Sequence, residues 1–371
     1  MRTPGNEQIE YRGNSCIVRF PGPRRVLSTS WLNGGYQKDL DAVFNHQIPL
    51  DACTACHSGG SIQEYLEGVA RGLLPDDVKA AGLVTCAEMK NTAVVSETFR
   101  DLSVSAIVTA GIDKNGARAG DPASYYENGT SFEPVGGTIN TILLIGADLP
   151  EYAMARAVMT ATEAKAAALQ QLMARSLYST GIATGSGTDM IAVISDPASP
   201  LSITDAGTHS ALGELIAKAV IRATQSALEK ETGLSPGSQH DVLVRLERYR
   251  VTKQDLWSIA ADAAGKDPSD PEEQELFYRH LEQWARRPGS VARIAAALHV
   301  IDEESWGLIP RKEACQSVCR IVEDPAGILH GLNCATIPPL RCLTETLAAH
   351  IYHRAHRMPA STGRNARRSG T

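Results

Sequence analysis

The chain lacks several features that would assign it to a class at once. Aromatic residues make up only 5% of its 371 residues. No apolar run reaches the roughly 18 residues of a membrane-spanning helix. The net charge is −6, and the only basic block is the short C-terminal run 364–368. The polar N-terminus MRTPGNEQIEY lacks the apolar segment of a signal peptide. We therefore expect a cytoplasmic protein without a membrane span or a nucleic-acid partner.

The chain holds only eight cysteines in 371 residues, which is too few for a disulfide scaffold. We therefore expect the cysteines to be thiols. Cys53-Thr-Ala-Cys56-His57 fits the attachment spacing of c-type haem, which requires an exported protein. A coincidental loop sequence is the default interpretation, and a metal site or redox pair is the alternative. Cys86 lies in an apolar segment, so a buried, inert thiol is favoured there over a nucleophile.

Strand and helix signals predict a mixed, partly parallel sheet in the first part of the chain. Buried strands are expected from three almost continuously apolar segments: 82–89, 104–112 and 138–147. A helix follows from Asp148, its expected N-cap, to about Arg175, and then a strand at 189–195. A second helix is expected from about Ser210 to Gly233. The order strand, helix, strand implies a crossover connection.

Two domains are expected, because strand signals vanish after residue 240. Residues 1–234 should form an α/β or α+β domain, in which 16–32 holds two strands turned by Pro21-Gly22-Pro23 and 62–72 forms a helix. Residues 241–358 should form an all-α domain, with helices starting after Thr252 and near four further segments: 271–286, 290–299, 311–322 and 340–357. The tail 359–371 should be disordered.

Polar residues stand among glycine and threonine where these strands end and helices begin, and such junctions often bind ligands in α/β proteins. His209, at a helix start, is the leading acid–base candidate, because the helix N-terminus favours the neutral imidazole. Asp189 follows a glycine-rich loop and is expected to orient a histidine or to bind a ligand. A solvated first turn and a turn cap are their respective alternatives. The loop leads into a strand, so it is not a Walker-type phosphate loop.

Two glutamates complete the catalytic candidates. Glu163 and Lys165 are two positions apart and point to different sides of their helix, so only Glu163 is retained. A solvated helix charge is its alternative. Glu214 is expected to orient a catalytic group or, alternatively, to form an exposed ion pair with Lys218 four residues later.

Eight motifs, in order, resemble the adenosylcobinamide amidohydrolase family: LSTSWLNGGY (27–36), FNHQ (44–47), LVTCAEM (83–89), VTAGI…NGARAGD (108–121), GTINTILLI (137–145), TATEAKAAAL (160–169), ATGSGTD (183–189) and AGTHSALGELIAKAV (206–220). The resemblance covers about residues 15–230. It implies hydrolysis of the amide between the aminopropanol arm and the corrin ring, giving adenosylcobyric acid for corrinoid salvage. The cobalt corrinoid is then the substrate, and no resident cofactor or metal is expected.

A ring of amides surrounds the corrin, so the resemblance favours residues that bind amides. Asn33, Asn45 and Asn140 are such candidates, and His46 is a candidate neighbour of the cobalt or a base. The remaining substrate-binding candidates are Gly34, Gly185, Gly187, Thr188 and Thr208. An ordinary turn is the alternative for Asn33 and Gly34. A corrinoid- or metal-binding carrier or sensor without hydrolysis stays open as a second function, and so does a homo-oligomer.

The C-terminal region resembles, more weakly, the helical phosphatidylglycerophosphatase A family, whose relatives include a phosphatase of cobalamin phosphate. The contact points are YRVTKQDL, DPAGILHGLN and the helix at 339–356. Where that family carries paired aspartates, this chain has Thr344-Glu345. Mg²⁺ needs clustered carboxylates, so an inactive, structural domain is expected. His350, His353 and His356 share one side of the last helix, where surface histidines are favoured over a metal site.

Overall fold

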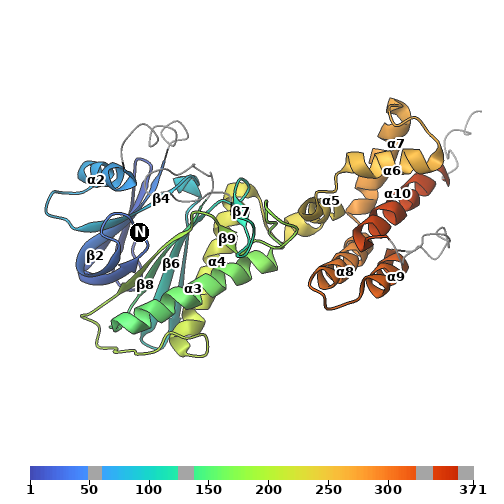
Figure 1. The fold of residues 1–371 in the computed structure, drawn as a ribbon. Helices are drawn as coiled ribbons and strands as arrows, with labels where there is room; N and C mark the ends of the chain where they lie inside the picture. The colour runs from blue at the N-terminus through green and yellow to red at the C-terminus, as the bar shows by residue number, and fades with distance from the viewer. Residues whose placement is uncertain (49–60, 124–137, 323–336, 358–371) are drawn as a thin grey trace, which may run out of the picture. The chain divides into compact units, whose positions relative to one another are not determined.

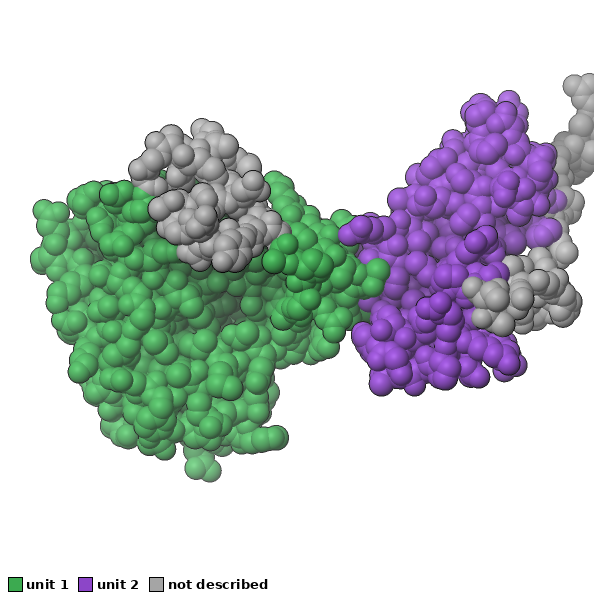
Figure 2. Space-filling view, viewed as in Figure 1, with its two compact units in different colours: residues 1–237 green, residues 238–371 purple. Residues whose placement is uncertain are grey.

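A computed structural model describes residues 1–48, 61–123, 138–322 and 337–357. The chain divides into two compact units, residues 1–237 and 238–371 (Figure 2). The first contains a mixed sheet with long helices, and the second is helical (Figure 1). This confirms the expected fold class. Among the described helices, none combines the length and the apolar character needed to cross a membrane.

An eight-stranded sheet forms the framework of the first unit. In hydrogen-bonding order its strands are β4 (Ala80–Thr85), β3 (Gly35–Gln47), β2 (Ser15–Ser28), β10 (Met190–Ser195), β8 (Ile139–Ile145), β6 (Leu102–Ala110) and β5 (Ala93–Phe99), and β1 (Gln8–Arg12) pairs with β2. β8 pairs with β10, and β3 with β4, in parallel. β10 is the last of these strands in sequence, yet it lies between β2 and β8.

Two long helices cover one face of this sheet (Figure 1). The predicted crossover is α3 (Glu151–Gln171), which connects β8 to β10, and α4 (Ala211–Thr232) packs beside it. Their contact is rich in small side chains, such as the buried Ala157, Ala161 and Ala223. Both helices start at the carboxyl end of β8 and β10, so they run in the same direction. Near their other ends Gln225 donates to Gln171 at 2.7 Å.

The opposite face of the sheet packs in part against other strands of the same sheet, because one of these strands is bent. Pro21-Gly22-Pro23 forms no turn between two strands, which corrects the expectation for 16–32, but lies within the single strand β2. The pairing of β2 with β3 shifts register between Arg19 and Val26, and such an irregularity bends a strand. The carboxyl ends of β3 and β4 thereby reach strands that they do not pair with. The Val84 amide of β4, for example, donates to Met190 Sδ at 3.5 Å.

The ends of α4 follow the local sequence, whereas the start of α3 does not. Ser210 caps α4 by accepting from the Gly213 amide at 2.9 Å, and Gly233 ends it with a positive φ, as expected. Asp148 does not cap α3, whose N-cap position is Pro150. Its carboxylate instead pairs with Arg25 of β2. The expected cap is therefore wrong, because a partner distant in sequence takes the side chain.

The second unit is built from α5 (Val242–Leu246), α6 (Lys253–Ala264), α7 (Pro271–Ala285), α8 (Pro288–Ser305), α9 (Arg311–Val322) and α10 (Pro339–Arg357). Thr252 opens α6 with the capping box that its sequence predicts. Asp302 is buried against Arg248, which donates to both of its oxygens at 2.9 and 2.6 Å. The basic tail and the DPAGILHGLN stretch lie outside the described residues.

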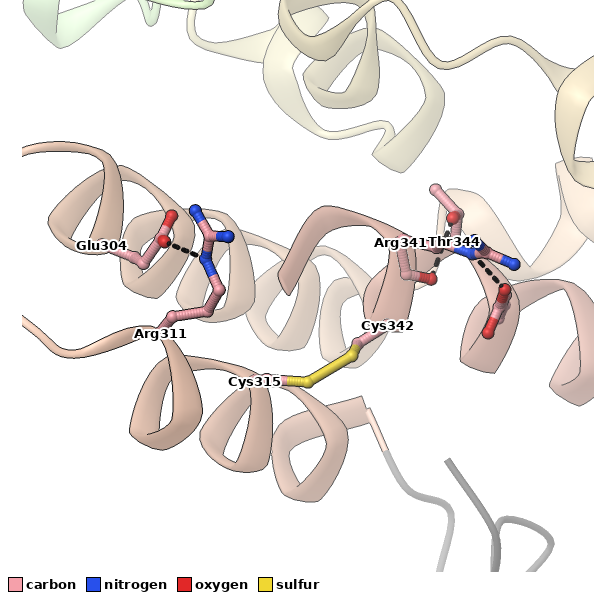
Figure 3. The surroundings of a disulfide bond; sticks show 7 residues. Glu304, Arg311, Cys315, Arg341, Cys342 and Thr344 are labelled. Atoms are coloured by element: carbon pink, nitrogen blue, oxygen red, sulfur yellow. Dashed lines mark hydrogen bonds and ion pairs between the residues drawn. A yellow bond between two sulfur atoms is a disulfide. The ribbon is translucent and has the colours of Figure 1, made fainter. Parts of the chain in front are cut away.

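The cysteines depart from expectation in two places. Cys315 and Cys342 form a disulfide between α9 and α10 (Figure 3), whereas thiols were expected throughout. Cys86 is partly exposed rather than buried, because β4 ends at Thr85 and leaves Cys86 beyond the strand. The Cys53–His57 motif lies outside the described residues.

Candidate active site

The predicted site residues lie at opposite ends of β8 and β10. Asn140 and Asp189 lie at the amino ends of these strands, whereas His209 follows their carboxyl ends. Five residue steps along β10 span roughly 16 Å. The structure therefore does not bring His209 together with Asn140 and Asp189.

The residues around His209 are open to solvent. Thr208 and His209 are exposed and immediately precede the Ser210 cap of α4. Glu214 is exposed and pairs with Lys218, which is the ion pair named as its alternative. Surface pairs of this kind add little stability. In this arrangement nothing holds Glu214 against His209, and a catalytic role for either residue stays a prediction.

The other end holds a network of charged and hydroxyl groups that we call the Asp189 cluster: Lys165, Ser186, Thr188, Asp189 and Thr138. Lys165 of α3 forms an ion pair with Asp189 Oδ2, and both side chains are only 15% exposed. Asp189 Oδ1 accepts from the Ile139 amide at 3.0 Å and from Ser186 Oγ at 2.5 Å. The backbone amide of Ser186 also donates to the carboxylate. A partly buried charge is stable only when it is paired and hydrogen-bonded in this way.

Hydroxyl groups continue the cluster away from the carboxylate. Ser186 Oγ lies 3.5 Å from Thr188 Oγ1, which lies 2.6 Å from Thr138 Oγ1. Asn115 Nδ2 donates to Thr188 Oγ1 at 3.4 Å. Such groups can relay a proton or bind amides, since each hydroxyl both donates and accepts. The cluster thus joins a carboxylate, an ammonium group and three hydroxyls beside the amino ends of β8 and β10.

Gly185 leaves space for the ion pair. A Cβ atom at residue 185 would lie 2.3 Å from Asp189 Oδ2 and 2.8 Å from Lys165 Nζ. At Gly187 a Cβ atom would meet nothing within 4 Å. Gly185 and Gly187 were expected to bind substrate. In the structure Gly185 makes room for a protein ion pair, and a ligand contact at Gly185 or Gly187 stays a prediction.

Asn45 and Asn140 lie deep in the sheet and bond to each other. Asn140 is 1% exposed, and its amide nitrogen donates to Asn45 Oδ1 at 2.8 Å and to the Val84 carbonyl at 2.7 Å. Its oxygen accepts from the Met190 amide at 3.2 Å. Asn45 donates in turn to Thr109 Oγ1 at 2.8 Å. Both amide hydrogens of Asn140 are used inside the protein, so the structure gives it a role in joining strands, and contact with substrate stays a prediction.

His46 lies at the carboxyl end of β3 between two hydroxyl groups. Ser15 Oγ is 2.7 Å from its Nδ1, and Tyr65 OH is 2.9 Å from its Nε2. Burial lowers the pKa of His46 below its usual value, because the charged imidazolium loses hydration. The neutral ring is the form that can act as a base or bind a metal.

Asn33 and Gly34 form the connection between β2 and β3. Asn33 adopts a positive φ and donates to the Ala80 carbonyl at 2.8 Å. A Cβ atom at Gly34 would lie 1.9 Å from the Ser30 carbonyl oxygen, so only glycine fits there. These contacts match the turn that was named as the alternative to substrate binding.

Lys165 is the residue that the sequence reasoning set aside. The two-residue spacing does place Glu163 and Lys165 on different sides of α3, but Glu163 is exposed and Lys165 faces Asp189. Helical position offered a signal, since Lys165 directly follows the buried Ala164 and lies four residues after the buried Ala161. Ser186 lies beside Asp189 within the same glycine-rich loop and was also overlooked.

One match to the nucleophile spacing G-x-S-x-G occurs, at Gly233–Gly237. In the hydrolases that use this motif the serine stands on a turn from a strand into a helix. Here the segment follows the end of α4 instead. The structural context of that nucleophile is therefore absent from this segment.

Comparisons with known proteins concern mainly the first unit. A family model described as adenosylcobinamide amidohydrolase matches residues 2–236. An uncharacterized protein of Methanocaldococcus jannaschii is 38% identical over 231 residues, or 58% of this chain and 86% of that protein. The adenosylcobinamide amidohydrolase of Methanosarcina mazei is 30% identical over 232 residues, or 60% of this chain and 98% of that protein. A solved protein of Pyrococcus horikoshii OT3 is 13% identical with a TM-score of 0.31, covering 60% of this chain and 83% of its own, which is too low to identify the fold.

Proposed function

The chain belongs to the adenosylcobinamide amidohydrolase family, and we propose that it hydrolyses the amide between the corrin ring and the aminopropanol arm of adenosylcobinamide. One water molecule adds across the C–N bond, which yields adenosylcobyric acid and free aminopropanol. The product can re-enter adenosylcobalamin synthesis, so the reaction serves corrinoid salvage. The proposal rests on the family match together with the Asp189 cluster. In this cluster the carboxylate forms an ion pair with an ammonium group and accepts a hydrogen bond from a hydroxyl.

Amide hydrolysis needs a base, a group that stabilises the oxyanion and a proton for the leaving amine. We assign the base to Asp189, because its Oδ1 already accepts a hydrogen bond from the Ser186 hydroxyl. The attacking oxygen is that of a water held beside Ser186, or that of Ser186 itself. In the second case the amine leaves first, the acyl group stays on Ser186 as an ester, and the water then hydrolyses this ester to release the acid. The proton that Asp189 takes up returns to the departing nitrogen, so the carboxylate is regenerated.

Lys165 is assigned to the oxyanion. Its ammonium group carries three donors, and the Asp189 pair occupies one side of it. A positive group in a partly buried position stabilises a developing negative oxygen more strongly than the same group in water does. The ion pair with Asp189 also fixes the position of the ammonium group before the substrate binds.

The first test is turnover of adenosylcobinamide by the purified chain, with adenosylcobyric acid detected by mass. Asp189→Asn should lower kcat by at least about 100-fold, as expected for a lost general base. Lys165→Met should lower it by about 100-fold or more, as expected for a lost oxyanion donor. Asparagine keeps the acceptor oxygen for the Ile139 amide, so circular dichroism should show an intact fold. Turnover should persist after dialysis against a chelator, since no resident cofactor is proposed.

His209→Ala tests the other candidate base, at the opposite end of β8 and β10. With Asp189 as the base, this variant should keep wild-type turnover. Loss of activity in His209→Ala together with full activity in Asp189→Asn would reverse the assignment. Absence of product from a folded wild-type sample would refute the hydrolysis. A change in the visible spectrum of cobinamide without product would then indicate the carrier or sensor function instead.

A further inference from the structure

Three cysteine side chains meet between α9 and α10 of the second unit. Cys315 and Cys319 belong to α9 and Cys342 to α10, and their sulfur atoms all lie within 4.8 Å of one another. Cys315 and Cys342 are fully buried, and Cys319 is 9% exposed. Figure 3 shows Cys315 and Cys342 joined as a disulfide. Among the described residues, no other set of three such ligand side chains lies this close together.

The disulfide between Cys315 and Cys342 does not explain why Cys319 lies beside it. A cross-link between α9 and α10 uses Cys315 and Cys342 alone, whereas Cys319 places another sulfur at the same point. Cys315 and Cys319 are four residues apart, so both project from one side of α9 toward α10. A pair of cysteines with three residues between them is also within the usual spacing of zinc ligands.

The distances suit one thiophilic ion. Zinc binds thiolate sulfur at about 2.3 Å, so two sulfurs of a tetrahedral site lie about 3.8 Å apart. The three sulfurs here lie within 4.8 Å of one another, and reduction frees those of Cys315 and Cys342 to separate to the spacing of a metal site. Thiolates prefer zinc, cadmium and copper(I) to magnesium or calcium, whose ligands are oxygens. A bound cation would neutralise the negative charge that the thiolates carry in a buried position.

We infer that Cys315, Cys319 and Cys342, in the reduced chain, form a three-thiolate site for a zinc-like metal ion that joins α9 to α10. The disulfide is the oxidised, metal-free form of the same cluster. A phosphine reductant converts it to two thiols by giving up two electrons and becoming the phosphine oxide, with water supplying the oxygen and the protons. Binding of the divalent ion then releases three protons from the three thiols.

The test uses the full chain, reduced by a phosphine without oxygen and stripped of metal with a chelator. Cadmium is the probe, because thiolate-to-cadmium charge transfer absorbs in the ultraviolet. The wild type should bind cadmium at this site with that absorbance, and binding should raise its thermal midpoint. Cys319→Ala should weaken this binding by at least about tenfold. Alanine favours helix, so this variant should fold, as circular dichroism can verify.

Cys86→Ala is the matched control, since Cys86 belongs to the first unit, and it should bind cadmium like the wild type. Equal binding by the wild type and Cys319→Ala would overturn the inference. Absence of cadmium binding by fully reduced wild type would also overturn it. The same holds if Cys53→Ser combined with Cys56→Ser removes all of the charge-transfer absorbance, because the metal would then be bound by those residues.

Discussion

At the scale of single residues, the space beside the Lys165–Asp189 pair exists because residue 185 is a glycine and carries no side chain. Gly185→Ala would place a Cβ atom 2.3 Å from Asp189 Oδ2, so the carboxylate must move away from Lys165. We expect a loss of about 1–3 kcal/mol in unfolding free energy, as in other overpacked sites, and a fall in turnover. Urea denaturation and the cobinamide assay measure the two effects.

Gly187→Ala is the control for this substitution, because its Cβ atom meets nothing within 4 Å. It should leave both the unfolding free energy and turnover close to those of the wild type. Equal effects of the two alanines would show that loop flexibility, rather than space around the ion pair, is what matters.

His46 predicts a pH dependence of stability. Burial lowers its pKa below the usual value of 6.5, so the folded protein resists a proton that the unfolded chain accepts. Stability is therefore complete above the unfolded pKa and decreases as the pH falls below about 6.5 toward the folded pKa. His46→Gln should weaken this dependence in denaturation curves recorded between about pH 7.5 and pH 5.5.

Contacts between residues that are distant in sequence could not be predicted from the sequence alone. Helical spacing correctly separated Glu163 from Lys165, but it could not decide which of them faces the site. The choice depends on Asp189, which is 24 residues from Lys165 and reaches it only because β10 returns beside β8. Glu214, by contrast, has its partner within one helical turn, and the sequence named Lys218 correctly.

At the scale of elements, Asn140 links β8 to two strands, β3 and β4, that form no backbone pairing with β8. Its amide holds Asn45 of β3 and Val84 of β4 against β8. Asn140→Ala should therefore cost about 2–4 kcal/mol of unfolding free energy, because several buried polar partners lose their hydrogen bonds. Urea denaturation followed by circular dichroism measures the change. Glu163→Ala, on an exposed face, should change it by about 0.5 kcal/mol or less. A similarly small cost for Asn140→Ala would contradict this role.

Element ends could be predicted wherever their partners are local. Ser210 and Gly233 bound α4 as expected, since capping uses neighbouring backbone groups. Asp148 fails as a cap because Arg25, 123 residues earlier, binds its carboxylate. The strand with Pro21-Gly22-Pro23 reads locally as a turn, and only its pairing with β3 keeps it one bent strand.

At the scale of the whole molecule, the family match and the compact unit end almost together. The match stops at residue 236 and the first unit at residue 237. A chain ended after residue 237 should therefore fold by itself and keep the amidohydrolase activity of the full chain. Circular dichroism and product formation measure this. A truncated protein that folds but makes no product would show that the helical unit takes part in the reaction.

The place of β10 has a consequence for the order in which the protein forms. Residues up to 85 supply one group of strands, β1 to β4, and residues 93–145 supply another, β5, β6 and β8. Until residues 190–195 leave the ribosome, each group presents an unpaired edge, at β2 and at β8. Such edges attract other chains, so the nascent protein passes through an interval in which aggregation competes with folding. The insertion of one short strand ends that interval by closing both edges at once.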